Sequence, residues 1–504
     1  MTETLEVLGS IAGTALLAAA LLVRGRRLRA PLVLAALAIA AALVAGQGWD
    51  EAESARTGVL VAGVVGGVAV LSALALLLYR LPLVLPVLLV AALPFRIPIE
   101  VSGEEANLLL PLYAVIGAGA IAFALDAFRR DREPPEPPPR ALLVAIAVAT
   151  VLYAVQAAYT NDVAFATRNI AFFLIPFAAM FVLLTEVRWT PRVLAATLGV
   201  FAAEAAVFSL VGIGQFAATE IFWNPALERS NEFHLYFRVN SLFWDPNIYG
   251  RYLALALVML ATVLVWTRRP ARIAALALLG ALIFAGLLFS FSQTSFIALL
   301  CGITALCALR YSLLWTALAT PFVVAAAVAA VLVIGGTSES EDDPREISSG
   351  RSSLIEGGVD LARSEPLVGH GSASFPLAFR EQEDLTTGKP AISHNEPVTV
   401  GAEQGAVGLI AYAGLLVAAA WTLLLGMRRL APGFGAPPDA IGDPFEDQGA
   451  IQGLARVGLV AAFAALLIHT IGYAGYLTDP LTWALLAAGG GLAAGARRAR
   501  EGPG

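Results

Sequence analysis

Long apolar runs alternate with short polar connections along almost the whole chain. A bilayer core about 30 Å thick is crossed by roughly 20 apolar helical residues, and the runs approach or reach that length. They span residues 5–23, 31–46, 57–78, 82–95, 108–125, 141–158, 169–185, 194–216, 247–267, 272–289, 294–310, 313–335, 404–427, 455–473 and 481–496. Because 31–46 and 82–95 are short, we expect 12–15 transmembrane helices. The runs lack the alternation of a membrane barrel, so the pattern predicts an all-α polytopic membrane protein.

The composition narrows the class further. Of the 504 residues, 58% are hydrophobic and 14% are charged, whereas a soluble domain is about 45–50% apolar and about 25% charged. These values exclude an ordinary soluble enzyme. The net charge of −6 and the lack of a basic tail argue against nucleic acid as a partner. The first run, 5–23, lacks a basic n-region and a small-residue cleavage site, so we interpret it as a retained helix.

The arginines predict which connections face the cytoplasm. Basic residues concentrate in short cytoplasmic loops, and if the crossings alternate, most arginine clusters fall on one side. These clusters are Arg24 to Arg29, Arg129 to Arg132, Arg268 to Arg272, Arg428 with Arg429, and Arg497 with Arg498. The Pro-rich connection 126–140 and the Gly/Pro/Asp-rich connection 428–454 are then cytoplasmic linkers. The long connections 217–246 and 336–403 lie on the extracytoplasmic side, and loops of such length are usually functional or disordered.

The larger extracytoplasmic loop contains a helical pattern of its own. From Arg351 to Arg363, apolar residues recur at helical spacing. We interpret this stretch as an amphipathic helix on the outer membrane surface, and the acidic run at 338–343 as a solvated segment. No internal repeat is visible, so the sequence predicts a single integral membrane domain over residues 1–504.

Four of the arginines on or beside the extracytoplasmic side, where the orientation rule predicts few, are candidates for function. Charges at membrane depth are costly and tend to be functional. Arg238 and Arg351 are the main candidates for binding a substrate anion, because arginine recognises phosphate in a bidentate manner. For Arg251, snorkelling to the interface stays open. For Arg363, a surface ion pair is the simpler interpretation.

Two polar segments border predicted crossings on the same side. Asp245 followed by Pro246 is typical of an N-cap with proline at the first helical position, and a helix N-terminus beside Arg238 would favour an anion. The other segment places His394 at the boundary between water and membrane. A neutral imidazole can accept a proton from a hydroxyl at pH 7, although an isolated interfacial histidine is more often inert.

Nothing in the sequence points to a metal or another cofactor. Cys301 and Cys307 are six residues apart in one apolar run. On a helix they would face different directions, so we expect neither a disulfide nor a metal site. The four histidines show no metal-ligand spacing.

Several motifs follow one another in a recognisable order. The most specific is the pair His394-Asn395, then nine residues, then Gly405 and Gly408. The others are Arg238 through Asn247 with its Pro-Asn ending, Gly350-Arg351 followed by the Pro-x-x-Gly-x-Gly of 366–371, and the serine-rich turn 289–295. Together they resemble the O-antigen ligase and O-antigen polymerase superfamily of integral membrane glycosyltransferases. The resemblance covers about 235–425, and it is weakest at Gln293, where an arginine is common.

This resemblance implies a fold of the GT-C type and a transferase at the outer face of the bacterial cytoplasmic membrane, in contact with membrane lipids. The donor would be a glycan linked to a lipid diphosphate of the undecaprenyl type. The acceptor would be a hydroxyl of a sugar or glycolipid, and neither metal nor nucleotide would be required. Whether the chain acts as a ligase or as a polymerase stays open.

The candidate residues can be given roles in such a transfer. Arg238 and Arg351 would stabilise the leaving diphosphate, and His394 would be the general base on the acceptor hydroxyl, which predicts inversion at the anomeric carbon. Gly405 and Gly408 would form a smooth helix face for close packing. Further substrate-binding candidates are Asn395, Asp245, Asn247, Arg251, Arg363 and Glu403.

Three other functions compete with this one. A transporter of bicarbonate or another small solute would place charges near the membrane midplane, and Glu204 is the residue that fits this expectation. A flippase for the same lipid-linked glycan would carry polar residues along many helices, which the runs do not show. A non-enzymatic envelope scaffold would leave the outer arginines and His394 unexplained.

Overall fold

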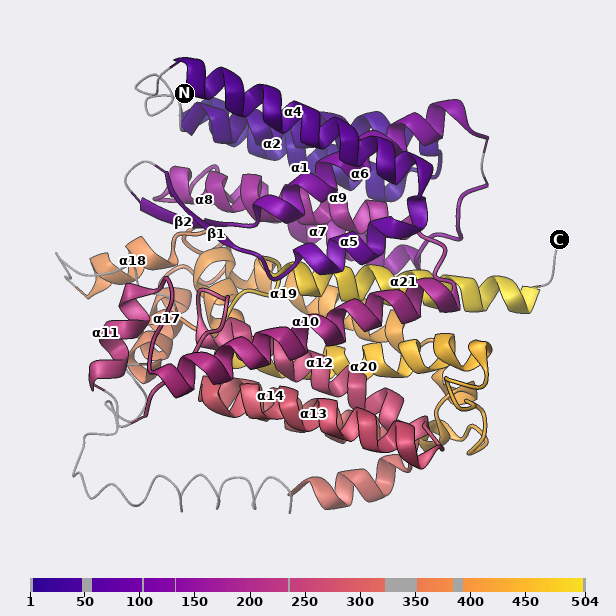
Figure 1. The fold of residues 1–504 in the computed structure, drawn as a ribbon. Helices are drawn as coiled ribbons and strands as arrows, with labels where there is room; N and C mark the ends of the chain where they lie inside the picture. Colours follow the sequence, from indigo (N-terminus) through magenta and orange to yellow (C-terminus); the bar gives the residue numbers. More distant parts are fainter. Residues whose placement is uncertain are drawn as a thin grey trace.

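Long helices run side by side between the two ends of the molecule (Figure 1). This computed structural model describes residues 3–47, 57–101, 104–131, 133–233, 236–321, 351–383 and 393–501. The end that we call the arginine-rich end holds the connections after α1 (Glu3–Leu22), α6 (Leu110–Arg129) and α12 (Pro246–Trp266). The opposite end, called the loop end, carries α11 (Pro225–Phe233), α17 (Arg351–Ser364) and α18 (Phe375–Gln382).

The helices begin where the sequence supplies a capping residue followed by proline. Asp245, Asn395 and Thr190 each accept a hydrogen bond from a backbone N–H in the first turn of the helix that follows, and proline suits the first helical position because it has no N–H to satisfy. The remaining elements are α2 (Arg26–Gln47), α4 (Thr57–Arg80), η1 (Pro82–Val84), α5 (Leu85–Ala92), β1 (Ile97–Val101), β2 (Glu104–Leu108), α7 (Arg140–Gln156), α8 (Val163–Asn169), η2 (Ile170–Leu174), α9 (Ile175–Thr185), α10 (Pro191–Ala218), α13 (Pro270–Ser290), α14 (Gln293–Arg310), α19 (Glu396–Leu424), η3 (Met427–Arg429), η4 (Pro432–Phe434), α20 (Gln448–Gly472) and α21 (Pro480–Glu501).

In the described part of the chain, ten helices are long and apolar enough to cross a membrane. A bent pair, Val65–Arg80 with Pro82–Ala92, brings the candidates to eleven if it is one span, and two further apolar helices, Arg140–Gln156 and Pro480–Ala496, are shorter. The prediction of an all-α polytopic membrane protein is confirmed. Beyond residue 321, the predicted crossing 313–335 lies outside the described residues.

A small hairpin is the element that the apolar runs did not predict. α4 and the helical segment after it meet at 108°, and the chain then forms β1, which pairs antiparallel with β2. The hairpin lies at the loop end (Figure 1). Arg96 stands directly before β1 and is thereby fixed at this end of the bundle.

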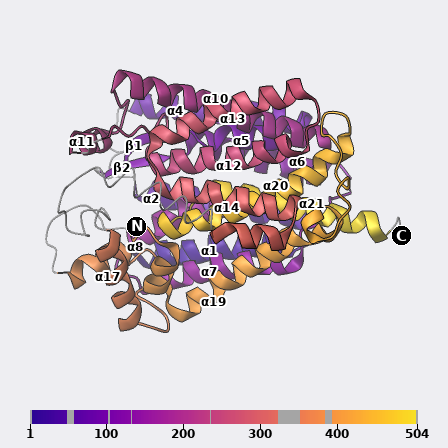
Figure 2. The ribbon, with the colours of Figure 1, turned by 90° about the horizontal axis from the view of Figure 1, so that it is seen from below.

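The core of the bundle surrounds α9, in which every residue is buried. This helix packs against α1, α2, α6 and α21, so residues from both halves of the chain enclose it. In the view from below, α12 and α14 lie beside α20 (Figure 2). A helix that is apolar on all sides is expected in such an interior position.

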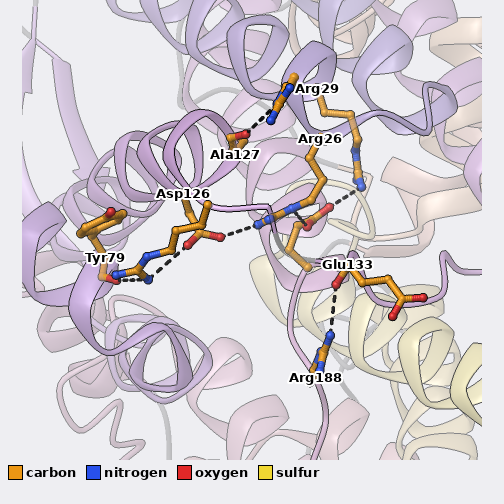
Figure 3. A network of polar contacts seen from close by, with 10 residues as sticks. Arg26, Arg29, Tyr79, Asp126, Ala127, Glu133 and Arg188 are labelled. Carbon is orange, nitrogen blue, oxygen red and sulfur yellow. Dashed lines mark hydrogen bonds and ion pairs between the residues drawn. The ribbon is translucent and has the colours of Figure 1, made fainter.

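Ion pairs join the helices at the arginine-rich end (Figure 3). Arg26 contacts Asp126 at 2.9 Å and Glu186 at 2.7 Å, and Arg29 pairs with the same Glu186. Asp126 also accepts from Arg130 at 3.2 Å. These residues come from α2, α6 and the end of α9, so the cluster fixes three helices against one another.

The predicted amphipathic helix of the large loop exists, but its position differs from the expectation. α17 packs against α18 and α19, and Leu361 is buried with Phe375 and Phe379 of α18. The apolar face therefore contacts protein instead of lying on the outer membrane surface. The spacing of apolar residues predicts which face of α17 is apolar. It does not predict what this face contacts, because the contacting residues lie on other helices.

Candidate active site

A cavity of about 290 Å³ lies between helices at the loop end of the bundle. Residues of α7, α8, α12, α19 and the α20–α21 connection form its walls. Four charged side chains line it: Arg96, Arg251, Glu396 and Glu403. In the described ranges, no group of three His, Cys, Asp or Glu side chains is placed to hold a metal ion.

Arg251 is buried in protein, so it does not snorkel to the membrane interface. Its residue surface is 3% exposed, its Nη2 lies 2.9 Å from Oδ2 of Asp479, and its guanidinium lies 5.8 Å from the ring centre of Tyr473. Nε and Nη1 are buried without a hydrogen-bond partner in the described part of the chain. A buried guanidinium with unfilled donors can bind an anion from the cavity.

Arg96 is the second cation on this cavity. Its charged neighbours include Asp479 and Arg251. Burial lowers the pKa of the Arg96 guanidinium, while the Asp479 carboxylate raises it, and a guanidinium stays protonated in proteins. No hydrogen bond or ion pair joins Arg96 to another described residue.

The acidic residues of the cavity are already occupied by backbone donors. Glu396 accepts a hydrogen bond from the Gly475 N–H at 2.5 Å. Glu403 accepts from the N–H groups of Ala373 at 2.9 Å and Phe375 at 3.3 Å. Glu403 therefore fastens the start of α18 to α19 while it lines the cavity.

α19 is broken beside the cavity, at Gly405. The backbone there has φ 62° and ψ −160°, which only glycine adopts without strain. Gly405 was expected to belong to a smooth helix face, and this expectation is wrong because the residue interrupts the helix. The break leaves backbone groups of α19 unpaired in the interior of the protein, where each must find a partner within the protein.

The loop 366–371 supplies these partners. The carbonyls of Pro366 and Leu367 accept from the N–H groups of Ala406 and Val407 at 2.9 and 3.2 Å. In the other direction, the N–H groups of His370 and Gly371 donate to Ala402 and Glu403 at 3.0 and 2.8 Å. The Pro-x-x-Gly-x-Gly motif and the break in α19 thus form one hydrogen-bonded unit.

His394 stands directly before α19 in a left-handed conformation, with φ 55°. The backbone on either side is fixed, because Asn395 caps α19 through the Val398 N–H and donates to the Ile471 carbonyl. The His394 ring lies 5.7 Å from the Tyr473 ring, between centroids. Since a non-glycine residue in this conformation is strained and such strain clusters at functional sites, the geometry agrees with a functional His394.

Of the two predicted diphosphate-binding arginines, Arg238 is the one whose side chain the structure describes. Arg238 donates from Nε to the Ser290 carbonyl at 3.2 Å, and its backbone is held by Asn231. Neither Arg238 nor His394 is among the described residues that line the cavity. Arg351 begins α17, and its side chain lies outside the described residues. The structure therefore places the ring of His394 and the guanidinium of Arg251 each beside the ring of Tyr473.

The remaining candidates of the Arg238–Asn247 segment have local partners. Asp245 accepts from the Asn247 N–H at 2.6 Å, which confirms the predicted N-cap. The Asn247 amide oxygen accepts from Ser292 at 2.8 Å. Ser292 contacts Ser295, which in turn contacts His469, so a buried polar chain links α12, α14 and α20.

Arg363 and Glu204 also have partners in the structure. Arg363 pairs with Asp360 at 3.0 Å on the exposed surface of α17, which agrees with the simpler interpretation of this residue. The Glu204 carboxylate accepts a hydrogen bond from the Tyr252 hydroxyl at 2.7 Å. This pairing accounts for a carboxyl group within α10 without a transported ion.

Sequence reasoning missed Arg96 and Asp479. Asp479-Pro480 repeats the Asp-Pro pattern of residues 245–246, and its Oδ1 accepts from the Leu481 N–H at the start of α21. Arg96 follows an apolar run on the loop side. Both features can be seen in the sequence. The proximity of Arg96 and Asp479 to Arg251, however, depends on packing between distant segments.

One family matches the chain. Residues 255–413 match the family model described as O-antigen ligase, and no curated protein matches the chain. The matched region runs from α12 into α19 and includes His394, Glu403 and Gly405, whereas Arg238 and Arg251 precede it. The match supports an O-antigen ligase-like glycosyltransferase activity in a multi-pass membrane protein.

Proposed function

We propose that the chain, whose residues 255–413 match the O-antigen ligase family model, transfers a glycan from a lipid diphosphate to a hydroxyl acceptor. The carrier is of the undecaprenyl type, and the acceptor is a sugar or glycolipid. The loop end faces the periplasm or cell exterior, because the arginine clusters lie at the other end. The family match carries this proposal, since it covers the break in α19 and His394.

The reaction is a single displacement that needs no metal. His394 accepts the proton of the acceptor hydroxyl as the oxygen attacks the anomeric carbon. The bond from that carbon to the diphosphate breaks, and its electron pair leaves with the diphosphate. Arg238 and Arg351 stabilise the charge that develops there. One displacement inverts the anomeric configuration.

The test uses the purified full-length protein in lipid nanodiscs with an undecaprenyl-diphosphate-linked oligosaccharide as both donor and acceptor. Released undecaprenyl diphosphate and lengthened glycan are measured by mass spectrometry. His394→Asn and His394→Gly suit this test because asparagine and glycine tolerate the left-handed backbone at position 394. We expect both variants to lose about 10²–10⁴-fold of the transfer rate while they unfold at the wild-type temperature.

His394→Gln is the matched control for backbone strain. Glutamine is polar like asparagine, but it does not share the tolerance of asparagine for the left-handed backbone at position 394. Transfer by His394→Asn at the wild-type rate would contradict the general-base role. Absence of released undecaprenyl diphosphate with the wild-type protein, with this donor and with an added glycolipid acceptor, would contradict the proposed function itself.

A further inference from the structure

The unused hydrogen-bonding capacity of the cavity is that of cationic donors. Glu396 and Glu403 accept from backbone N–H groups, and Asp479 forms an ion pair with Arg251 and accepts from the Leu481 N–H. By contrast, Nε and Nη1 of Arg251 lack partners among the described residues, and Arg96 lines the same space. A ligand that fills this capacity brings acceptor oxygens, and a negatively charged group binds most strongly.

The walls of the cavity have the character of a sugar-binding site. Aromatic rings form part of them, and amide and hydroxyl groups form another part; these residues are Tyr153, Phe165, Phe173, Tyr412 and Tyr473, with Asn169, Ser393, Thr399, Gln404 and Thr478. Aromatic faces accommodate the apolar face of a pyranose ring, and dispersed polar groups bind its hydroxyls. The volume of about 290 Å³ lies at the lower end of the roughly 300–1,000 Å³ of small-molecule pockets, so it suits one ring.

We propose that this cavity binds one anionic sugar unit of the glycan, whose carboxylate or phosphate substituent contacts Arg96 and Arg251. The inference rests on the proposed function and adds a specificity site to it. The site is distinct from the position of Arg238, which donates to the Ser290 carbonyl and does not line the cavity.

Asp479 positions Arg251 for this role. It engages Nη2 and leaves Nε and Nη1 for the ligand. Two arginines around one oxyanion give more donors than a neutral sugar hydroxyl can accept. The site therefore discriminates an acidic sugar from its neutral counterpart, because a neutral sugar would leave donors of the buried Arg251 guanidinium without acceptors.

The experiment measures binding to the purified full-length protein by isothermal titration calorimetry. The probes are glucuronate, glucose 6-phosphate, glucose and inorganic diphosphate. We expect the wild type to bind at least one acidic sugar tenfold or more tightly than glucose. Arg96→Gln should remove this preference and leave diphosphate binding unchanged. Arg229→Gln, on the exposed surface of α11 at the same end, should bind every probe like the wild type.

Arg96 is the position of choice because Arg251→Gln would leave Asp479 buried without its partner. Unchanged binding of both acidic sugars by Arg96→Gln, at a wild-type unfolding temperature, would overturn the proposal. Binding of inorganic diphosphate with no preference for acidic sugars would also overturn it, since the cavity would then hold the diphosphate. The transfer assay separates the proposed function from the proposed sugar site. If the wild type is inactive but binds acidic sugars in an Arg96-dependent way, only the proposed function is refuted. If the wild type is active but shows no such binding, only the sugar site is refuted.

Discussion

Arg251 and Asp479 form an ion pair of 2.9 Å in which each side chain is 4% exposed. Removing one member of such a pair leaves an uncompensated buried charge, which costs about 3–5 kcal/mol. We expect Asp479→Asn to lower the stability of the protein by this amount, measured as thermal unfolding in detergent. Asparagine keeps a side-chain oxygen for the N-cap of α21, so the loss reports the ion pair.

The exposed pair between Arg363 and Asp360 provides the control. Their side chains are 76% and 60% exposed, and pairs of this kind contribute about 0–1 kcal/mol. Asp360→Asn should therefore unfold within one or two degrees of the wild type. Equal unfolding temperatures for Asp479→Asn and Asp360→Asn would show that the buried pair does not hold α12 against α21.

Gly405 supplies the second prediction. A methyl group at this position would meet the backbone of Leu367 and Gly369, and φ 62° disfavours every other residue. Gly405→Ala should therefore lower the unfolding temperature and reduce glycan transfer, because the loop 366–371 must separate from α19. Gly414→Ala is the matched control: it lies on the same helix, and nothing is within 4 Å of its added methyl group.

Alanine is the better helix former by about 1 kcal/mol, so Gly414→Ala should be neutral or slightly stabilising. The opposite order, with Gly405→Ala as the more stable variant, would show that α19 is continuous in the membrane. The transfer rate adds a second measurement, since closure of the break would move the segment that carries His394 and Glu403 relative to the rest of α19.

The third prediction concerns the cluster at the arginine-rich end. Glu186 contacts Arg26 and Arg29, and its side chain is 8% exposed. Glu186→Gln leaves two partly buried guanidinium groups with less negative charge, so we expect a loss of several kcal/mol. Glu446→Gln, in the exposed pair with Arg269, should unfold like the wild type. A small effect of Glu186→Gln would mean that Asp126 alone neutralises the cluster.

The sequence predicts local features of this fold well. Apolar runs locate the helices because each crossing must bury about 20 residues in lipid, and Asp245-Pro246 marks a helix start because capping needs only neighbouring residues. Gly405 shows the limit of this reasoning. The sequence shows that Gly405 belongs to a motif. Its left-handed conformation, however, depends on the loop 366–371, which lies about 35 residues away along the chain and forms hydrogen bonds with α19 on either side of Gly405.

The cavity could not be predicted for the same reason. Arg96, Arg251 and Asp479 come from three distant segments, and no periodicity along the chain relates them. Arg238 was selected because it lies near a helix start, yet its guanidinium contacts Ser290 of α13. Position along the chain therefore does not tell which arginines line the cavity.

The connection between α19 and α20 supplies the last prediction, which concerns pH. Asp443 accepts from the N–H groups of Arg268 and Phe445 at 2.8 and 2.9 Å. Burial raises the pKa of Asp443, but these hydrogen bonds and the nearby Arg272 lower the pKa by more than burial raises it. The pKa of Asp443 therefore lies below the usual value. The ionised form thus fastens the connection to the α12–α13 turn.

A carboxyl group whose folded-state pKa is lowered stabilises the protein above its unfolded-state pKa, which is about 3.9 for aspartate. This contribution is lost as the pH falls through the folded-state value. Asp443→Asn should therefore unfold at a lower temperature than the wild type at pH 7. The difference should begin to shrink as the pH falls below about 4 and should vanish below the folded-state pKa of Asp443, where both side chains are neutral. Asp439→Asn, exposed in the same connection, should match the wild type at pH 7. A difference for Asp443→Asn that persists unchanged at pH 3 would mean that shape, and not charge, explains the effect.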